Sequence, residues 1–146
     1  MKCKLCNQQS NAPSDITKSK IDDPTQPRLR QYPKHSEGAS HPRSFLSAWF
    51  DKYEWAEYSQ EFDVMFCYAC RHFSPPSYGN AEDAFTTTGF RRWKKVHGKD
   101  GGIEKHQKSQ YHKLSSLAWV DYKLNRSQMA KTLLLSKISA KLTKRR

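Results

Sequence analysis

Hydrophobic and aromatic positions are concentrated in the middle of the chain. Every aromatic residue lies between Tyr32 and Tyr122, whereas the first 31 and the last 24 residues contain none. Residues 1–28 are polar and interrupted by prolines, a pattern typical of a disordered tail. The distribution predicts a disordered N-terminal tail over residues 1–28, a folded domain over residues 29–122 and a basic helix or tail over residues 123–146.

Local periodicities within this domain predict short secondary-structure elements. Phe45, Trp49 and Tyr53 recur at helical spacing, so we expect a helix from Pro42 to about Tyr53 that buries one aromatic face. Apolar residues alternate along residues 62–67. This period of two predicts a half-buried strand that ends at a cysteine pair.

Two further helices are expected after a loop rich in proline and serine. The threonines at 86–88 can cap a short helix whose inward residues are Phe90, Trp93 and Val96. Glycines break this helix, and the next one should begin near Ile103. The apolar residues expected to close the core from that helix are Leu114, Leu117, Ala118 and Trp119.

The C-terminal extension carries a short apolar stripe. Leu135, Ile138 and Leu142 recur at three- and four-residue spacings. This stripe is too short to predict a coiled coil by itself. We expect it to dock on the remainder of a longer parent chain.

The four cysteines fall in two C-x2-C pairs, Cys3 with Cys6 and Cys67 with Cys70. Two intervening residues allow both thiolates to bind one metal ion from a tight turn. The N-terminus lacks a secretory signal, so a disulfide framework is not expected. A thioredoxin-like dithiol would require a βαβ pattern, which does not surround the second pair.

Two downstream histidines complete a metal-binding pattern with the second cysteine pair. His106 and His112 give the spacing C-x2-C-x35-H-x5-H, which predicts one structural zinc ion, with His72 and His97 as the competing ligands. Residues six apart on a regular helix point about 120° away from each other. We therefore expect a kink or a wide turn between Gln107 and Tyr111.

The first cysteine pair has a similar but weaker pattern. His35 and His41 repeat the H-x5-H spacing downstream of Cys3 and Cys6, so a second zinc site is an alternative. The intervening residues offer little to pack, and loose thiols on a disordered end are the default expectation. The expected fold is therefore a small zinc-stabilised α+β domain with a short strand, a zinc knuckle and several helices.

Charge points to a polyanionic partner. Lysine and arginine total 26 against 14 acidic residues, giving a net charge of +12. The candidate nucleic-acid-binding residues are Arg91, Arg92, Lys94, Lys95, Lys105 and Lys108. The acidic stretch 51–63 should face away from that partner, and the basic tail is typical of a nuclear import signal or a solubilising end. No apolar run is long enough to span a membrane.

Several motifs, in this order, resemble those of one family. They are HPRSF at 41–45, FCYACRHF at 66–73, FTTTGF at 85–90 and HQKS at 106–109 with His112. The match covers about residues 29–122 and resembles the TTF-type zinc finger of hAT-superfamily transposases and of related transcription factors and MYM-type zinc-finger proteins. The resemblance implies zinc ligation by Cys67, Cys70, His106 and His112, and DNA binding in the nucleus. We do not expect an active transposase, because the chain stops before a catalytic domain.

The first functional hypothesis is a zinc-dependent DNA-binding module of hAT-type origin. Cysteine pairs followed by H-x5-H also resemble matrin-type fingers, so binding of double-stranded RNA is an alternative, although the long insert after Cys70 argues against it. A protein-interaction module is a third hypothesis. We do not expect an enzyme, because four protein ligands leave no open position on the metal.

Overall fold

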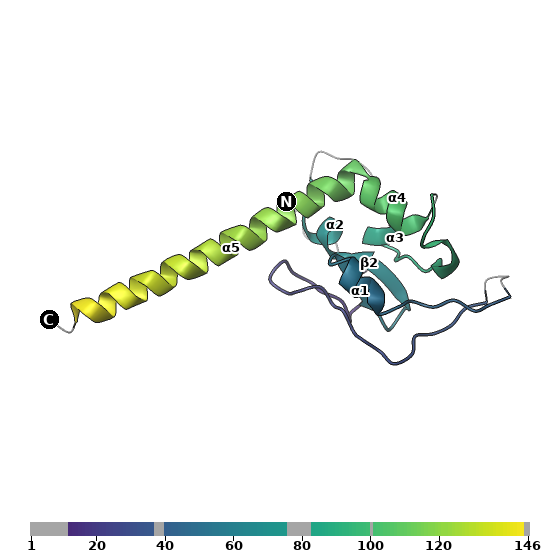
Figure 1. Ribbon diagram of the computed structural model, residues 1–146, viewed down its shortest axis with the longest axis horizontal. Helices are drawn as coiled ribbons and strands as arrows, with labels where there is room; N and C mark the ends of the chain where they lie inside the picture. The colour runs from purple at the N-terminus through teal and green to yellow at the C-terminus, as the bar shows by residue number, and fades with distance from the viewer. Residues whose placement is uncertain (1–11, 37–39, 76–82, 100, 145–146) are drawn as a thin grey trace, which may run out of the picture.

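A two-stranded antiparallel hairpin lies at the centre of the fold (Figure 1). The computed structural model describes residues 12–36, 40–75, 83–99 and 101–144. Strand β1 (Ala56–Ser59) pairs with β2 (Val64–Cys67) in a register that runs from Ala56 opposite Cys67 to Ser59 opposite Val64. Every residue of both strands is buried. The hairpin, several helices and a buried Cys/His cluster confirm the α+β class.

Both faces of the hairpin are covered. Tyr58 and Met65 belong to the main aromatic core, whereas Val64 and Phe66 pack with Ile16 in a smaller cluster. The expected half-buried strand is therefore buried on both sides. Phe62, which the alternation placed in the strand, lies in the turn and is 50% exposed.

The segment that covers the second face consists of residues 12–28. Its backbone runs along β1, where the Tyr58 N–H donates to the Thr25 carbonyl at 3.0 Å, and the Tyr68 hydroxyl donates to the Asp22 carbonyl at 2.6 Å. The expectation of a disordered tail is wrong for these residues, because a few apolar side chains and many polar contacts hold them. Residues 1–11 lie outside the described part of the chain.

The first helix is shorter than its periodicity predicts. Helix α1 covers only Ala48–Lys52, because Arg43 is drawn into an antiparallel bridge with His35 through backbone hydrogen bonds of 2.8 and 2.9 Å. The predicted aromatic face is nevertheless buried. Phe45, Trp49 and Tyr53 are at most 7% exposed.

The prediction of a helix after residue 86 is wrong. Helices α2 (Tyr68–His72) and α3 (Asp83–Thr86) end at or before residue 86. In the region of the expected helix, the structure has a single 3-10 turn, η1 (Trp93–Lys95). Between α3 and η1, the backbone of Phe90 pairs with that of Met65 in β2 through hydrogen bonds of 2.8 and 2.9 Å. This pairing requires an extended backbone at Phe90, which a helix does not have. Phe90, Trp93 and Val96 still face the core, as predicted.

Two helices complete the chain. Helix α4 (Gly102–Lys108) begins where the glycines predict, and α5 (Gln110–Thr143) extends far beyond the body of the domain (Figure 1). Trp119 of α5 is buried against Tyr68, but Leu117 and Ala118 face outward, contrary to expectation. Every described residue from 123 onward is exposed. Within the described ranges, no helix is long and apolar enough to cross a membrane.

Candidate metal centre and basic groove

The cysteine pair lies at the junction of the hairpin and α2. Cys67 ends β2 and caps α2, and its sulfur accepts a hydrogen bond from the Cys70 N–H at 3.4 Å. Both cysteines are almost completely buried, at 0% and 1% exposure. The strand therefore delivers the first sulfur, and the first turn of the helix brings the second beside it, as the C-x2-C spacing predicts.

The two histidines lie on either side of a break between α4 and α5. His106 belongs to α4 and His112 to α5, while Ser109 between them has an extended ψ of 142°. The Ser109 hydroxyl donates to the His106 carbonyl at 2.7 Å and accepts from the His112 N–H at 3.2 Å. The predicted kink is confirmed, and the capping serine turns both imidazoles toward the cysteines.

The four donor atoms are close enough to hold one ion. Cys67 Sγ lies 3.5 Å from His112 Nδ1, and Cys70 Sγ lies 3.5 Å from the same nitrogen and 3.6 Å from His106 Nε2. All four donors fall within 4.8 Å of one another. A tetrahedral site with ordinary metal–sulfur and metal–nitrogen bonds separates sulfur from nitrogen by about 3.6 Å. The cluster therefore fits a single metal ion.

Aromatic rings and a serine surround the cluster. Phe85 stacks on His106 with ring centres 4.1 Å apart, and Trp55 lies 5.2 and 5.1 Å from the two imidazoles. Ser116 Oγ contacts His112 Nε2 at 3.2 Å, which leaves Nδ1 facing the sulfurs. These neighbours were not predicted from the sequence. The four-residue step from His112 to Ser116 is the one local signal that could have indicated such a contact.

The thiols differ in acidity. A hydrogen bond from Cys67 lowers the pKa of Cys70 to about 3, with further lowering by His106 and His112. Burial raises the pKa of Cys67 well above its usual value. Binding of an ion by both sulfurs requires both to be thiolates, so it would release the proton of Cys67, whose pKa is raised.

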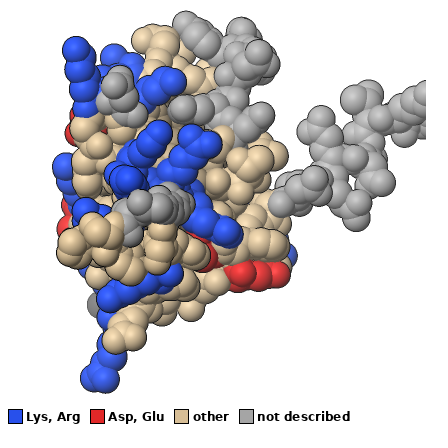
Figure 2. All heavy atoms as spheres, turned by 90° about the vertical axis from the view of Figure 1, so that its right-hand side faces the viewer, with Lys and Arg blue, Asp and Glu red and all other residues tan. Residues whose placement is uncertain are grey.

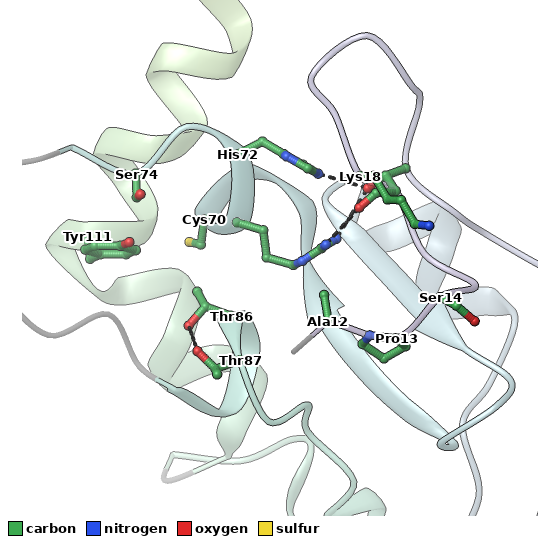
Figure 3. Close-up of a pocket in the computed structure, with 12 residues that line it drawn as sticks. Ala12, Pro13, Ser14, Lys18, Cys70, His72, Ser74, Thr86, Thr87 and Tyr111 are labelled. Atoms are coloured by element: carbon green, nitrogen blue, oxygen red, sulfur yellow. Dashed lines mark hydrogen bonds between the residues drawn. The ribbon is translucent and has the colours of Figure 1, made fainter. Parts of the chain in front are cut away.

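A polar cavity of about 590 Å³ adjoins the cluster at Cys70. Figure 3 shows Cys70, Ser74 and Tyr111 on one side of it and Lys18 and Ser14 on the other. Such a cavity gives an ion or a chelator a route to the otherwise buried sulfur.

The competing ligands do not join the cluster. His72 contacts Thr17 at 3.0 Å, and His97 packs edge-on against Trp49. The possible second zinc site included His35 and His41. His35 pairs with Asp63, and His41 contacts Ser40. Cys3 and Cys6 lie outside the described residues, so that site stays an expectation.

Basic side chains surround a groove between η1 and α4. The groove has a volume of about 500 Å³, and its basic lining residues are Arg91, Arg92, Lys95 and Lys105. All four are exposed, and among the described residues that line the groove none is acidic. Figure 2 shows lysine and arginine side chains gathered on the end of the molecule opposite the free end of α5.

The candidate nucleic-acid-binding residues are not equivalent. Arg91 donates to the carbonyls of Phe62 and Asp63, the latter at 3.2 Å, and so holds the hairpin turn as well as lining the groove. Lys94 and Lys108 are exposed but do not line it. The groove is therefore lined by three further basic residues that do not bond to the hairpin turn. They are Arg92, Lys95 and Lys105.

Three acidic residues of the 51–63 stretch form ion pairs with basic residues of the same chain. Glu57 is fully buried and pairs with Arg71, while Asp51 pairs with Arg28 at 2.6 Å and Glu54 with Lys123 at 2.7 Å. None of the three acidic residues is part of the groove lining.

Comparison of the chain with protein-family models, with curated proteins and with solved structures finds no match. The interpretation of both sites therefore depends on the residues and geometry of this chain alone.

Proposed function

We propose that this chain is a zinc-dependent DNA-binding module in which the metal centre fixes one wall of a basic groove. The observation that carries the proposal is the direct succession of Lys105 and His106 in α4. Lys105 lines the groove, and His106 belongs to the metal cluster. Loss of the metal would therefore free the helix that forms the groove wall.

The donor set favours zinc. Two thiolates and two imidazoles at tetrahedral spacing are the ligands of structural zinc sites, and the four residues here are at most 5% exposed. Bound zinc would supply a cross-link between the β2–α2 junction and the α4–α5 break. Four protein ligands leave no position for a reactive water, so the ion would have a structural role.

Zinc content and folding can be tested on the same samples. Metal analysis should find one zinc per wild-type chain, and circular dichroism should show loss of structure on chelation. Cys67→Ser and His112→Ala should lose both zinc and structure. His97→Ala is the matched control, because His97 is exposed and outside the cluster. Zinc retained in both cluster variants would contradict the assignment.

The groove supports nucleic acid as the partner. Its basic residues are exposed, the described part of its lining contains no acidic residue, and the whole chain has a net charge of +12. Lysine and arginine bind phosphates with release of counterions, so affinity falls steeply with salt. Arg92 is the residue of the groove best able to contact a base edge, since arginine can pair with guanine through two hydrogen bonds, whereas the Arg91 guanidinium is bonded to the hairpin turn.

Charge reversal in the groove tests the binding face. Arg92→Glu with Lys95→Glu should weaken binding to duplex DNA and reduce the slope of log affinity against log salt by about 1.8, or 0.9 per phosphate contact. Lys34→Glu with Lys52→Glu is the matched control, because it changes net charge equally outside the groove. Equal loss in the two double variants would mean that overall charge, not the groove, binds DNA.

The same assay separates DNA from the alternatives. Duplex DNA and duplex RNA of equal length are compared at one salt concentration. Stronger binding to RNA would favour a matrin-like finger, and no binding to either at about 150 mM salt would favour a protein-interaction module. The resemblance to TTF-type fingers supports DNA as the binding partner. It also supports two further parts of this proposal, an origin in a hAT-type transposase and a nuclear location.

A further inference from the structure

Helix α5 has apolar residues on more than one face, of which the domain covers only one. His112, Ser115 and Trp119 are its buried residues and lie against the body. Large apolar side chains elsewhere on the helix are between 47% and 67% exposed. They are Leu117, Val120, Leu124, Met129, Leu133, Leu134, Leu135, Ile138 and Leu142.

Most of these residues form one narrow stripe. At about 100° per residue, all of them except Met129, Leu133 and Leu134 fall within an arc of about 60°. The arc lies roughly opposite the buried face, because Trp119 is about 160° from Leu117 around the helix axis. The stripe from Leu117 to Leu142 is about 38 Å long. It consists of two groups of apolar residues, one from Leu117 to Leu124 and one from Leu135 to Leu142, and polar residues occupy the same face between them.

We propose that this stripe packs against the same stripe of a second copy in antiparallel orientation. Pairing about a point between residues 129 and 130 places Leu117 opposite Leu142, Leu124 opposite Leu135 and Val120 beside Ile138. Each residue that contacts a partner is contacted in return, as two-fold symmetry requires. The spacing of the stripe is therefore complementary to itself.

Charge favours the antiparallel orientation over the parallel one. Lys131 lies at the centre of the stripe and would face Lys131 of the second copy in a parallel pair. The antiparallel pair places it opposite Gln128, a neutral side chain. On the flank, Lys123 approaches Lys137 of the second copy, but Lys123 is already paired with Glu54 at 2.7 Å.

The test is the mass of the full chain in solution with charge-swap variants. At about 100 μM the average mass should rise from the 17.0 kDa of one chain toward twice that value. Leu124→Glu and Leu135→Lys should each give monomers. The double variant should dimerise again, because the introduced carboxylate and ammonium groups face each other twice in the antiparallel pair, whereas a parallel pair would bring like charges together.

A matched control lies outside the stripe on the same helix. Met129 is 66% exposed but is about 150° from the centre of the stripe, so Met129→Glu should leave the dimer intact. Circular dichroism confirms that each variant keeps its helix. A wild-type chain that stays monomeric would overturn the proposal, even if it binds anionic vesicles or an acidic protein. Failure of the double variant to dimerise would overturn the antiparallel pairing.

Discussion

Replacement of Ser109 by alanine tests whether the break between α4 and α5 builds the metal centre. The Ser109 hydroxyl makes two hydrogen bonds, one to the His106 carbonyl and one from the His112 N–H. These two contacts involve the backbones of both histidine ligands. Their loss should allow the helices to straighten, which turns the imidazoles away from each other.

The magnitude follows from the two contacts. Loss of a serine cap destabilises a helix by about 1 kcal/mol, and loss of a second hydrogen bond to a carbonyl adds about 0.5–1 kcal/mol. Where folding and metal binding are coupled, this loss of stability weakens the apparent free energy of metal binding by the same amount. A loss of about 1.5–2 kcal/mol corresponds to zinc binding that is about 12- to 30-fold weaker.

Competition with a chromophoric chelator measures this change. Ser109→Asn should bind within about threefold of the wild type, because asparagine is an equally good cap. Ser136→Ala is the matched control, since its hydroxyl bonds to the Leu133 carbonyl on the exposed part of α5. Equal affinities of Ser109→Ala and the wild type would refute the reasoning, as would an equal loss in Ser136→Ala.

Three further changes test the fold that supports the site. Glu57→Ala leaves the nearly buried Arg71 guanidinium without its carboxylate, so denaturant unfolding should show a loss of about 3–5 kcal/mol, whereas an unchanged midpoint would contradict a role for the pair. Gly102→Ala places a Cβ 2.3 Å from the Phe90 ring, and thermal unfolding should show about 1–3 kcal/mol of destabilisation unless the ring moves freely. Burial and the hydrogen bond to Asp63 raise the pKa of Tyr58. The unfolded chain therefore loses this proton near pH 10 while the folded chain keeps it, so stability should fall as pH rises above about 10, and less steeply in Tyr58→Phe.

Short-range patterns predicted which residues form the buried Cys/His cluster. Cys67 and Cys70 are separated by two residues, and His106 and His112 by five, so the stereochemistry of each pair is decided within one or two turns of chain. The kink at Ser109 followed from the same argument, because a regular helix cannot present both imidazoles to one ion. The set of aromatic core residues was also predictable, since aromatic side chains are concentrated in one part of the chain.

Long-range pairing explains the predictions that were wrong. The helices expected around residues 42–47 and 86–96 are replaced by backbone bridges of Arg43 with His35 and of Phe90 with Met65. Local periodicity contains no information about such partners. The aromatic residues remain buried in both cases, because burial depends on side-chain chemistry more than on the local backbone conformation.

The sequence by itself determined the four residues of the Cys/His cluster, the position of the helix break and most aromatic residues of the core, because each depends on residue type and on spacing within a few turns. Only the tertiary structure decided that residues 12–28 cover the hairpin and that Glu57 is buried with Arg71. It also decided that Arg91 holds a turn while Arg92, Lys95 and Lys105 line a groove. These features join residues far apart in the chain, and they depend on which surfaces meet when the elements pack.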